Sequence, residues 1–173
     1  SDPTEFTAQL AQYSSLEQLF NINESLEPLN ALSGEFGRLS ALSLIDRNVV
    51  VNDNTFAFDG EQARMGFSFQ DEVESATIYI RNENGQSVRQ IEAGRPASGE
   101  NWVQWDGTDA DGNMLASGTY TFSAVGRTRE GTEVQGRPLV ESRIIGADFS
   151  DSNQTLLTEN GPVQISEITR VSQ

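Results

Sequence analysis

The stretch that decides the fold covers residues 101–126 and reads NWVQWDGTDADGNMLASGTYTFSAVG. Its two ends are typical of β-strands: Tyr120 and Phe122 alternate with threonine and serine, and two tryptophans lie at the other end. The loop between them is polar and rich in glycine. We therefore expect two strands of a β-sandwich, with Trp105 and Tyr120 supplying core area near one end of it.

Short runs of β-strand character, separated by Gly, Asn and Asp, extend from this stretch in both directions. They cover residues 49–51, 55–58, 64–70, 76–81, 88–91, 140–147, 154–157 and 163–168. The turn formers at 52–54 predict a hairpin of the first two runs, and Asn84-Gly85 predicts a two-residue hairpin turn. The sequence thus predicts a mainly β protein from residue 46 onward.

These strands are predicted to form two parts. Residues 63–138 make an Ig or fibronectin III-like β-sandwich, somewhat smaller than the ~100 residues usual for that class. The flanking segments 46–62 and 139–173 need partners, and they pair most economically with each other. The expected result is a small five-stranded barrel that the sandwich interrupts as an insertion, preceded by a helical arm at 1–45.

The helical arm carries an amphipathic pattern. Apolar residues recur at steps of three and four, which a period of 3.6 gathers on one face; they are Phe6, Leu10, Tyr13, Leu16 and Phe20. We predict that this stripe mediates self-association by coiled-coil-like packing, the alternative being that it packs on the β-part of its own chain. Pro28 removes a backbone donor, so a break in the helix is expected between 23 and 28.

Composition excludes several classes of function. Lys and Arg number 11 against 26 Asp and Glu, and a net charge of −15 repels nucleic acid and anionic lipid. No apolar run approaches the ~20 residues that span a bilayer, so membrane insertion is not expected. The absence of Cys and His removes disulfides, His-based triads and the usual zinc ligands. We therefore expect no enzyme, no catalytic residue and no cofactor.

The loop of the deciding stretch contains a candidate metal site, formed by Asp106, Asp109, Asp111 and Asn113. Aligning Gly112 with the central glycine of a calcium loop puts Gly107 at the first ligand position and Gly118 where a bidentate Glu belongs. We therefore expect Asx-type turns and no metal, with these three glycines permitting positive φ in tight turns.

Two further groups have alternative interpretations. Trp102 and Trp105 are candidates for a platform that stacks on sugar, which keeps open a secreted carbohydrate-binding or adhesin-type Ig-like module. Their separation of three puts them on opposite faces of a regular strand, so we expect one in the core and one at the rim. The acidic run of Asp71, Glu72 and Glu74 is interpreted as a solvated loop.

Two segments resemble one known family. TEFTAQLAQYSSLEQL at 4–19 is similar to the N-terminal motif of the bacterial flagellar hook-capping proteins. The order W-D-G-x-D-x-x-G-x-x-L-x-x-G-x-Y-x-F resembles the Ig-like insert of that family, and more loosely other bacterial Ig-like modules; it is carried by Trp105, Asp106, Gly107, Gly112, Gly118, Tyr120 and Phe122. The resemblance spans nearly the whole chain and implies a Tudor-like barrel with the Ig-like domain nested inside it.

The resemblance also implies a function. It is that of a non-enzymatic scaffold, a cap at the growing tip of the flagellar hook that promotes polymerisation of hook subunits. Its implied partners are those subunits and further copies of the chain in a ring-like homo-oligomer. The implied location is extracellular, after export through the flagellar type III system, although no export signal is visible. Because the chain starts with Ser1, we also expect an N-terminal truncation relative to the family.

Overall fold

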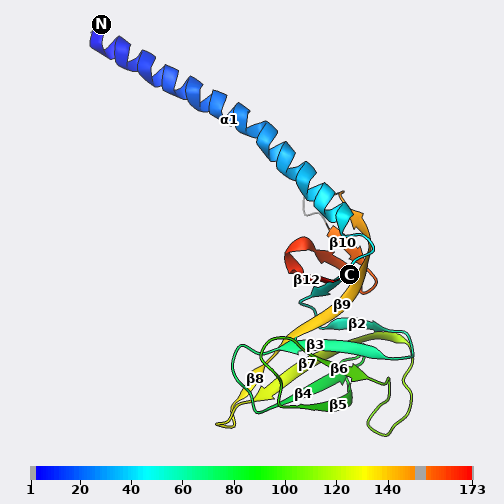
Figure 1. The fold of residues 1–173 in the computed structure, drawn as a ribbon. Coiled ribbons are helices and arrows are strands. Elements are labelled where there is room, and N and C mark those ends of the chain that lie inside the picture. The colour runs from blue at the N-terminus through cyan, green and yellow to red at the C-terminus, as the bar shows by residue number, and fades with distance from the viewer. Residues whose placement is uncertain (1–2, 151–154, 173) are drawn as a thin grey trace. The chain divides into compact units, whose positions relative to one another are not determined.

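The computed structural model describes residues 3–150 and 155–172, without the side chains of 3–6, 8–9, 27, 29–31 and 33. The chain divides into two compact units, Ser1–Ser43 and Leu44–Gln173. Helix α1 (Pro3–Ser43) makes up the first unit, and every described strand belongs to the second (Figure 1). The predicted fold class, mainly β with an N-terminal helical arm, is confirmed.

Helix α1 is continuous over 41 residues, so the predicted break between 23 and 28 is wrong. Pro28 lies inside the helix, where its ring costs one backbone hydrogen bond. The neighbouring turns remain helical, and the Ser25 hydroxyl donates to the Asn21 carbonyl oxygen at 2.7 Å. Flanking Leu, Glu and Ala residues favour the helix and offset the loss. No helix in the described residues is long and apolar enough to cross a membrane.

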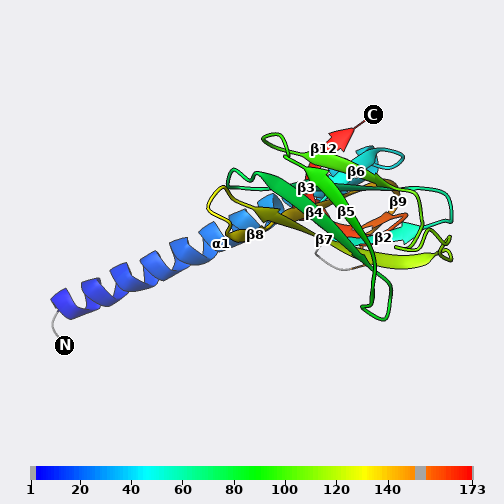
Figure 2. The same cartoon turned by 90° about the horizontal axis from the view of Figure 1, so that it is seen from below.

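One sheet of the second unit has five strands in the order β2-β7-β4-β5, with β8 also paired to β7. The strands are β2 (Thr55–Phe58), β4 (Ser75–Arg81), β5 (Ser87–Gly94), β7 (Gly118–Arg127) and β8 (Glu133–Gln135). Figure 2 shows β4, β5 and β7 side by side. The side chains of β4 alternate as predicted, with Ala76, Ile78 and Ile80 fully buried.

The turn between β4 and β5 differs from the predicted two-residue hairpin. The Asn82 N–H donates to the Gln86 carbonyl at 3.0 Å, which leaves a three-residue loop between them. Gly85 takes a φ of 76° in this loop, the left-handed position that follows a type I turn in three-residue hairpins. The Asn82 side chain stabilises the loop by accepting the N–H groups of Asn84 and Gln86.

The other sheet has seven strands. Five follow the order β11-β10-β9-β1-β12, while β3 pairs with β9 and β6 pairs with β3. The strands are β1 (Asn48–Val51), β3 (Ala63–Ser68), β6 (Asn101–Trp105), β9 (Arg137–Asp148), β10 (Thr155–Thr158), β11 (Gly161–Gln164) and β12 (Ile168–Ser172), with a 3₁₀ turn, η1 (Ile165–Glu167), before β12. Strand β9 pairs with β3 through residues 137–140, with β1 through 140–143 and with β10 from 144 to 148.

The predicted hairpin between 49–51 and 55–58 is wrong, because β1 and β2 lie in different sheets. Between them the Asp53 carboxylate accepts the N–H groups of Asn54 and Thr55, at 2.6 and 3.0 Å, and forms an Asx turn. This turn redirects the chain towards β7. There Phe56 and Phe58 join an aromatic cluster with Tyr120. Burial of these aromatic rings stabilises the fold more than pairing of β2 with the valines of β1 would.

The two sheets face each other across this cluster. Trp105 of β6 packs on Phe56 and Phe58 of β2, with ring centroids 6.1 and 4.8 Å apart, and on Tyr120 of β7 at 5.1 Å. Other buried residues of both sheets include Met65, Phe67, Ile78, Ile80 and Phe122. Further along the seven-stranded sheet, Val49, Ile144 and Leu156 are buried. The division at 62/63 and 138/139 stays a prediction, and it separates β2 from its partner β7.

Candidate assembly surface

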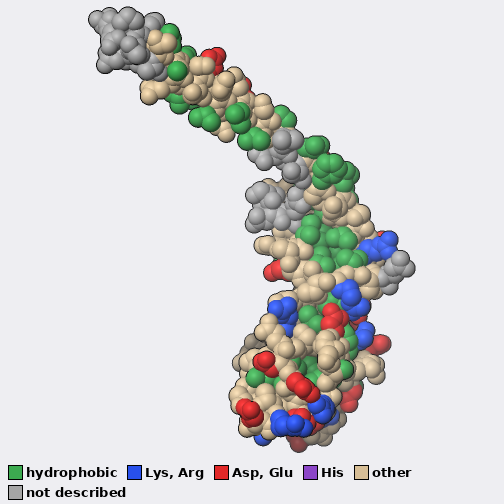
Figure 3. Space-filling model, turned by 60° about the vertical axis from the view of Figure 1, so that its left-hand side comes forward, with side chains coloured by type: hydrophobic (Ala, Val, Ile, Leu, Met, Phe, Trp, Pro, Cys, Tyr) green, Lys and Arg blue, Asp and Glu red, His purple; other side chains and the backbone are tan. Residues whose placement is uncertain are grey.

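Helix α1 exposes its described apolar side chains to an unusual extent. In the predicted stripe, Tyr13 is 72% exposed, Phe20 70%, Leu16 54% and Leu10 53%, while the side chain of Phe6 lies outside the described residues. Large apolar side chains are also exposed at Leu19, Ile22, Leu26, Leu32, Phe36, Leu39 and Leu42. Figure 3 shows hydrophobic side chains along this helix. Contiguous exposed apolar surface of this kind marks an interaction site.

Charge is scarce along the same segment. Glu17 is the one ionisable acid or base between Thr7 and Ile22 other than the phenol of Tyr13, and the polar residues there are Gln, Ser, Thr and Asn. Further along α1, Glu35 and Arg38 form an ion pair at 3.6 Å, one turn apart. A face with so little charge suits packing against another apolar helix more than recognition of a charged ligand.

The aromatic residues of the W-D-G to G-x-Y-x-F motif have structural roles. Trp105 is 1% exposed, and its indole N–H donates to the Thr108 carbonyl at 2.9 Å. The Tyr120 hydroxyl donates to the Ala116 carbonyl at 2.8 Å, the tyrosine corner of Ig-like sandwiches. Burial raises the pKa of Tyr120, with a smaller contribution from Glu83. Phe122 is buried beside Phe56.

The acidic loop between β6 and β7 folds through its own carboxylates. Asp106 accepts the Thr108 hydroxyl at 2.7 Å and its N–H at 3.1 Å, and the hydroxyl bond is the main reason why the pKa of Asp106 is lowered. Asp109 accepts the N–H groups of Asn113 and Asp111, both at 2.9 Å, and the pKa of Asp109 is lowered chiefly by Asn113. These bonds are the predicted Asx turns. In the described residues, no group of three or more acidic side chains is arranged to hold a metal.

Two of the three glycines in this motif take positive φ as expected, Gly107 at 78° and Gly112 at 85°. Gly107 also lies against the core, where a Cβ would collide with the Phe58 ring. The expectation is wrong for Gly118, which starts β7 without a positive φ.

Trp102 lies on the opposite face of β6 from Trp105, as their spacing predicts. It pairs with Gly66 of β3, and a Cβ at Gly66 would come within 2.8 Å of its ring. The Arg64 guanidinium lies 4.5 Å from the centre of the same ring. Trp102 is thus a partly exposed cover over β3 while Trp105 is in the core, so the two rings form no common platform for a sugar.

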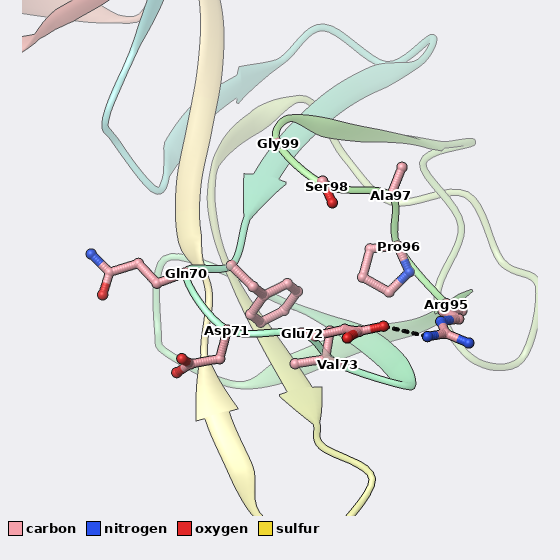
Figure 4. A pocket seen from close by; sticks show the side chains of 10 residues that line it. Gln70, Asp71, Glu72, Val73, Arg95, Pro96, Ala97, Ser98 and Gly99 are labelled. Atoms are coloured by element: carbon pink, nitrogen blue, oxygen red, sulfur yellow. Dashed lines mark hydrogen bonds and ion pairs between the residues drawn. The ribbon is translucent and has the colours of Figure 1, made fainter.

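The acidic run at 71–74 borders a hollow of about 590 Å³, also lined by Phe69, Val73 and residues 95–99 (Figure 4). Glu72 accepts a hydrogen bond from Arg95 at 2.5 Å, and Figure 4 shows the two side chains pointing towards each other. Glu74 lies 3.6 Å from Arg95 and 3.8 Å from Arg129. The loop is exposed to solvent, as predicted, and two of its carboxylates are also ion-paired. Glu72 is 82% exposed, so these pairs contribute little to stability.

Comparison with known proteins finds a match to the Ig-like region and further matches along nearly the whole chain. The family model described as the FlgD Ig-like domain matches residues 52–130. The basal-body rod modification protein FlgD of Escherichia coli is 28% identical over 98% of this chain and 80% of its own length. The corresponding protein of Salmonella typhimurium is 26% identical over 98% of this chain and 79% of its own length.

Solved structures agree with these sequence matches. FlgD from Xanthomonas campestris, described as giving insights into the hook capping essential for flagellar assembly, superposes with a TM-score of 0.70 at 26% identity, over 78% of this chain and 98% of its own. FlgD from Pseudomonas aeruginosa shares the fold, with a TM-score of 0.66 at 20% identity over 75% of this chain and 98% of its own. Together these likenesses show that residues 52–130 match the FlgD Ig-like domain and that the chain is similar, along nearly its whole length, to FlgD proteins.

Proposed function

We propose that this chain is a scaffold for assembly of the flagellar hook, a cap that promotes polymerisation of hook subunits at the growing tip. The observation that carries the proposal is its similarity to E. coli FlgD over 98% of the chain. The FlgD Ig-like domain at 52–130 and the likeness to the hook-capping structure from X. campestris support it. In this role the protein acts by binding and catalyses no reaction.

The proposed cap is a ring-like homo-oligomer held together by α1. The stripe formed by Leu10, Tyr13, Leu16 and Phe20, with Phe6 as its first member, is the contact between copies. Its four described side chains are more than half exposed, which supports a role in association because such surface is stabilised by burial.

The second unit then faces the hook subunits outside the cell. Its surface carries single ion pairs such as Arg64–Glu141 at 3.1 Å and Arg143–Glu159 at 2.8 Å, with all four side chains partly exposed. Contacts made by such surfaces are weak and sensitive to salt, which suits a cap that each newly added subunit displaces. Export through the flagellar type III system is part of the same proposal.

A carbohydrate-binding or adhesin-type module is not favoured. That alternative depended on Trp102 and Trp105 lying side by side, whereas Trp105 is buried and Trp102 covers Gly66 on the other face.

The experiment that tests the proposal measures both activities of the cap. The chain is compared with a double variant, Tyr13→Ala with Phe20→Ala, and with the matched control Leu157→Ala, which truncates an exposed side chain of β10. Self-association is followed by sedimentation velocity. Elongation of hook seeds by purified hook subunits from the same bacterium is followed by electron microscopy.

We expect the unchanged chain and Leu157→Ala to associate and to promote elongation at substoichiometric amounts. The double variant is expected to lose about tenfold or more in association affinity, and to lose promotion with it. Elongation of the hook seeds at the same rate with and without the chain would contradict the proposed scaffold function.

A further inference from the structure

Glu17 occupies an unusual place on α1. It lies seven residues after Leu10, four after Tyr13 and three before Phe20, spacings that put all four side chains on one side of a helix. The three apolar neighbours are 53%, 72% and 70% exposed, in that order. A carboxylate therefore sits inside the apolar stripe, where an uninterrupted association surface would carry another apolar residue.

No cation of α1 lies near this carboxylate. Arg38 is the sole basic residue of α1, and it is 21 residues away, about 31 Å along a helix with a rise of 1.5 Å per residue. Arg38 is also 3.6 Å from Glu35. In a side-by-side assembly of parallel helices, the same distance separates Glu17 from the Arg38 of a neighbouring copy. Glu17 therefore lies in the contact between two copies of α1 without an ion-pair partner from either helix.

The occupant of the stripe that fits these charges is a second copy of α1. Residues 44–173 carry 20 acidic side chains against 10 arginines, so the β-units of two copies repel each other. The segment from Thr7 to Ile22 carries the single charge of Glu17, so two copies meet there with little charge repulsion. A basic partner would be attracted more strongly to the second unit, which carries 20 acidic side chains, than to this stripe, which contains one.

We infer that Glu17 is the residue that keeps the self-association of α1 weak and reversible, an inference that rests on the proposed function. Association brings several Glu17 carboxylates together and moves them from water into an apolar seam. Both the like charges and the loss of hydration oppose the assembled state. The stripe then holds the cap together while each copy can still shift as subunits are added.

The test is Glu17→Gln, which keeps the size and shape of the side chain and removes its charge. Glu130→Gln is the matched control, because it makes the same change in net charge at an exposed position in the loop before β8. The dissociation constant and the dissociation rate of the full chain are measured for all three proteins by sedimentation velocity and by dilution followed with light scattering. Salt concentration is held constant throughout, because salt screens the general repulsion between copies.

Glu17→Gln is expected to tighten association about tenfold and to slow dissociation, while Glu130→Gln stays within about twofold of the unchanged chain. Equal affinities for the two variants would overturn the role of Glu17 and leave self-association standing. Failure of all three proteins to associate would remove the proposed self-association, and the role of Glu17 with it.

Discussion

Trp105 is the residue on which the sandwich depends most directly. Its indole ring contacts Phe56 and Phe58 in the facing sheet, and its N–H satisfies the Thr108 carbonyl. Truncation to Ala leaves a cavity between the sheets and frees that carbonyl, so we expect Trp105→Ala to lower the free energy of unfolding by about 3–5 kcal/mol.

Trp102→Ala is the natural control, because Trp102 lies on the same strand and is partly exposed. Urea titrations followed by circular dichroism should give it less than half the effect of Trp105→Ala. Equal losses for the two tryptophans would contradict the assignment of Trp105 to the core.

Asp109 makes the stability of the sandwich depend on pH. Its pKa is lowered from 3.8 by hydrogen bonds from Asn113, so the folded state favours the carboxylate. A lowered pKa contributes stability that is present above pH 3.8 and is lost as the pH falls through the lower value of the folded state. We therefore expect Asp109→Asn to be less stable than the unchanged chain at pH 7, with the difference closing as the pH falls through the lowered pKa of Asp109.

Thermal unfolding at pH 7 and pH 2.5 measures this difference. Asp111→Asn removes a charge from the same loop and controls for general repulsion. A difference that is constant between the two pH values would show that the Asp109 bonds do not act through its charge.

At the scale of the elements, Asn160 joins the turn between β10 and β11 to β2. Its side-chain oxygen accepts the Ala57 N–H at 3.1 Å, and its own N–H donates to the Ser142 hydroxyl at 3.2 Å. Asn160→Ala leaves the Ala57 N–H without this acceptor, and we expect a loss of about 1–2 kcal/mol in stability.

The other Asn-Gly turn offers the matched control. Asn84 lies exposed in the loop between β4 and β5, and it receives its support from Asn82. Asn84→Ala should change stability by less than about 0.5 kcal/mol in the same urea titration. A similar loss for both variants would argue that the turn sequence, and not the link to β2, causes the effect.

Local sequence patterns predict most helices and strands of this fold. The pairing between strands that are far apart in the sequence could not be predicted from them. Alternation at Ala76, Ile78 and Ile80 located β4, and the spacing of the two tryptophans assigned them to opposite faces. The pairing of β2 with β7 was missed, because it depends on an aromatic cluster assembled from three strands, β2, β6 and β7. The break at Pro28 was over-predicted, because a single lost donor was given more weight than the helix formers around it.

The assembly surface was partly readable in the same way. The 3.6-residue period identifies the stripe, but periodicity carries no information on how far its side chains are exposed. Exposure of Tyr13 and Phe20 had to come from the structure. The place of Glu17 in the stripe does not follow from the apolar pattern, because a charged residue does not contribute to it, although its spacing from Tyr13 and Phe20 is visible in the sequence.

For the whole molecule, the distribution of ionisable groups predicts insensitivity to pH near neutrality. The chain has no His and no Cys, and all 11 of its basic side chains are arginine. Carboxyl groups titrate near pH 4 and tyrosines near pH 10, so side-chain charge is constant from about pH 6 to about pH 9. We expect the melting temperature to be flat across this range and the electrophoretic mobility to change by no more than the single charge of an α-amino group.

Differential scanning calorimetry and capillary electrophoresis check both quantities. A melting temperature that moved by more than about 2 °C between pH 6 and 9 would point to a side chain with a strongly displaced pKa or to an α-amino group whose pKa changes on folding.

Strand β9 has a mechanical consequence. Its 12 residues are continuous and pair with β3 at the start of the strand and with β1 and β10 further along. A single strand therefore connects these three strands of the second unit. A load placed on either end must shear hydrogen bonds along its whole length before the parts can swing apart. A force applied at the β3 end of β9 is thereby passed to β1 and β10 as rigid displacement.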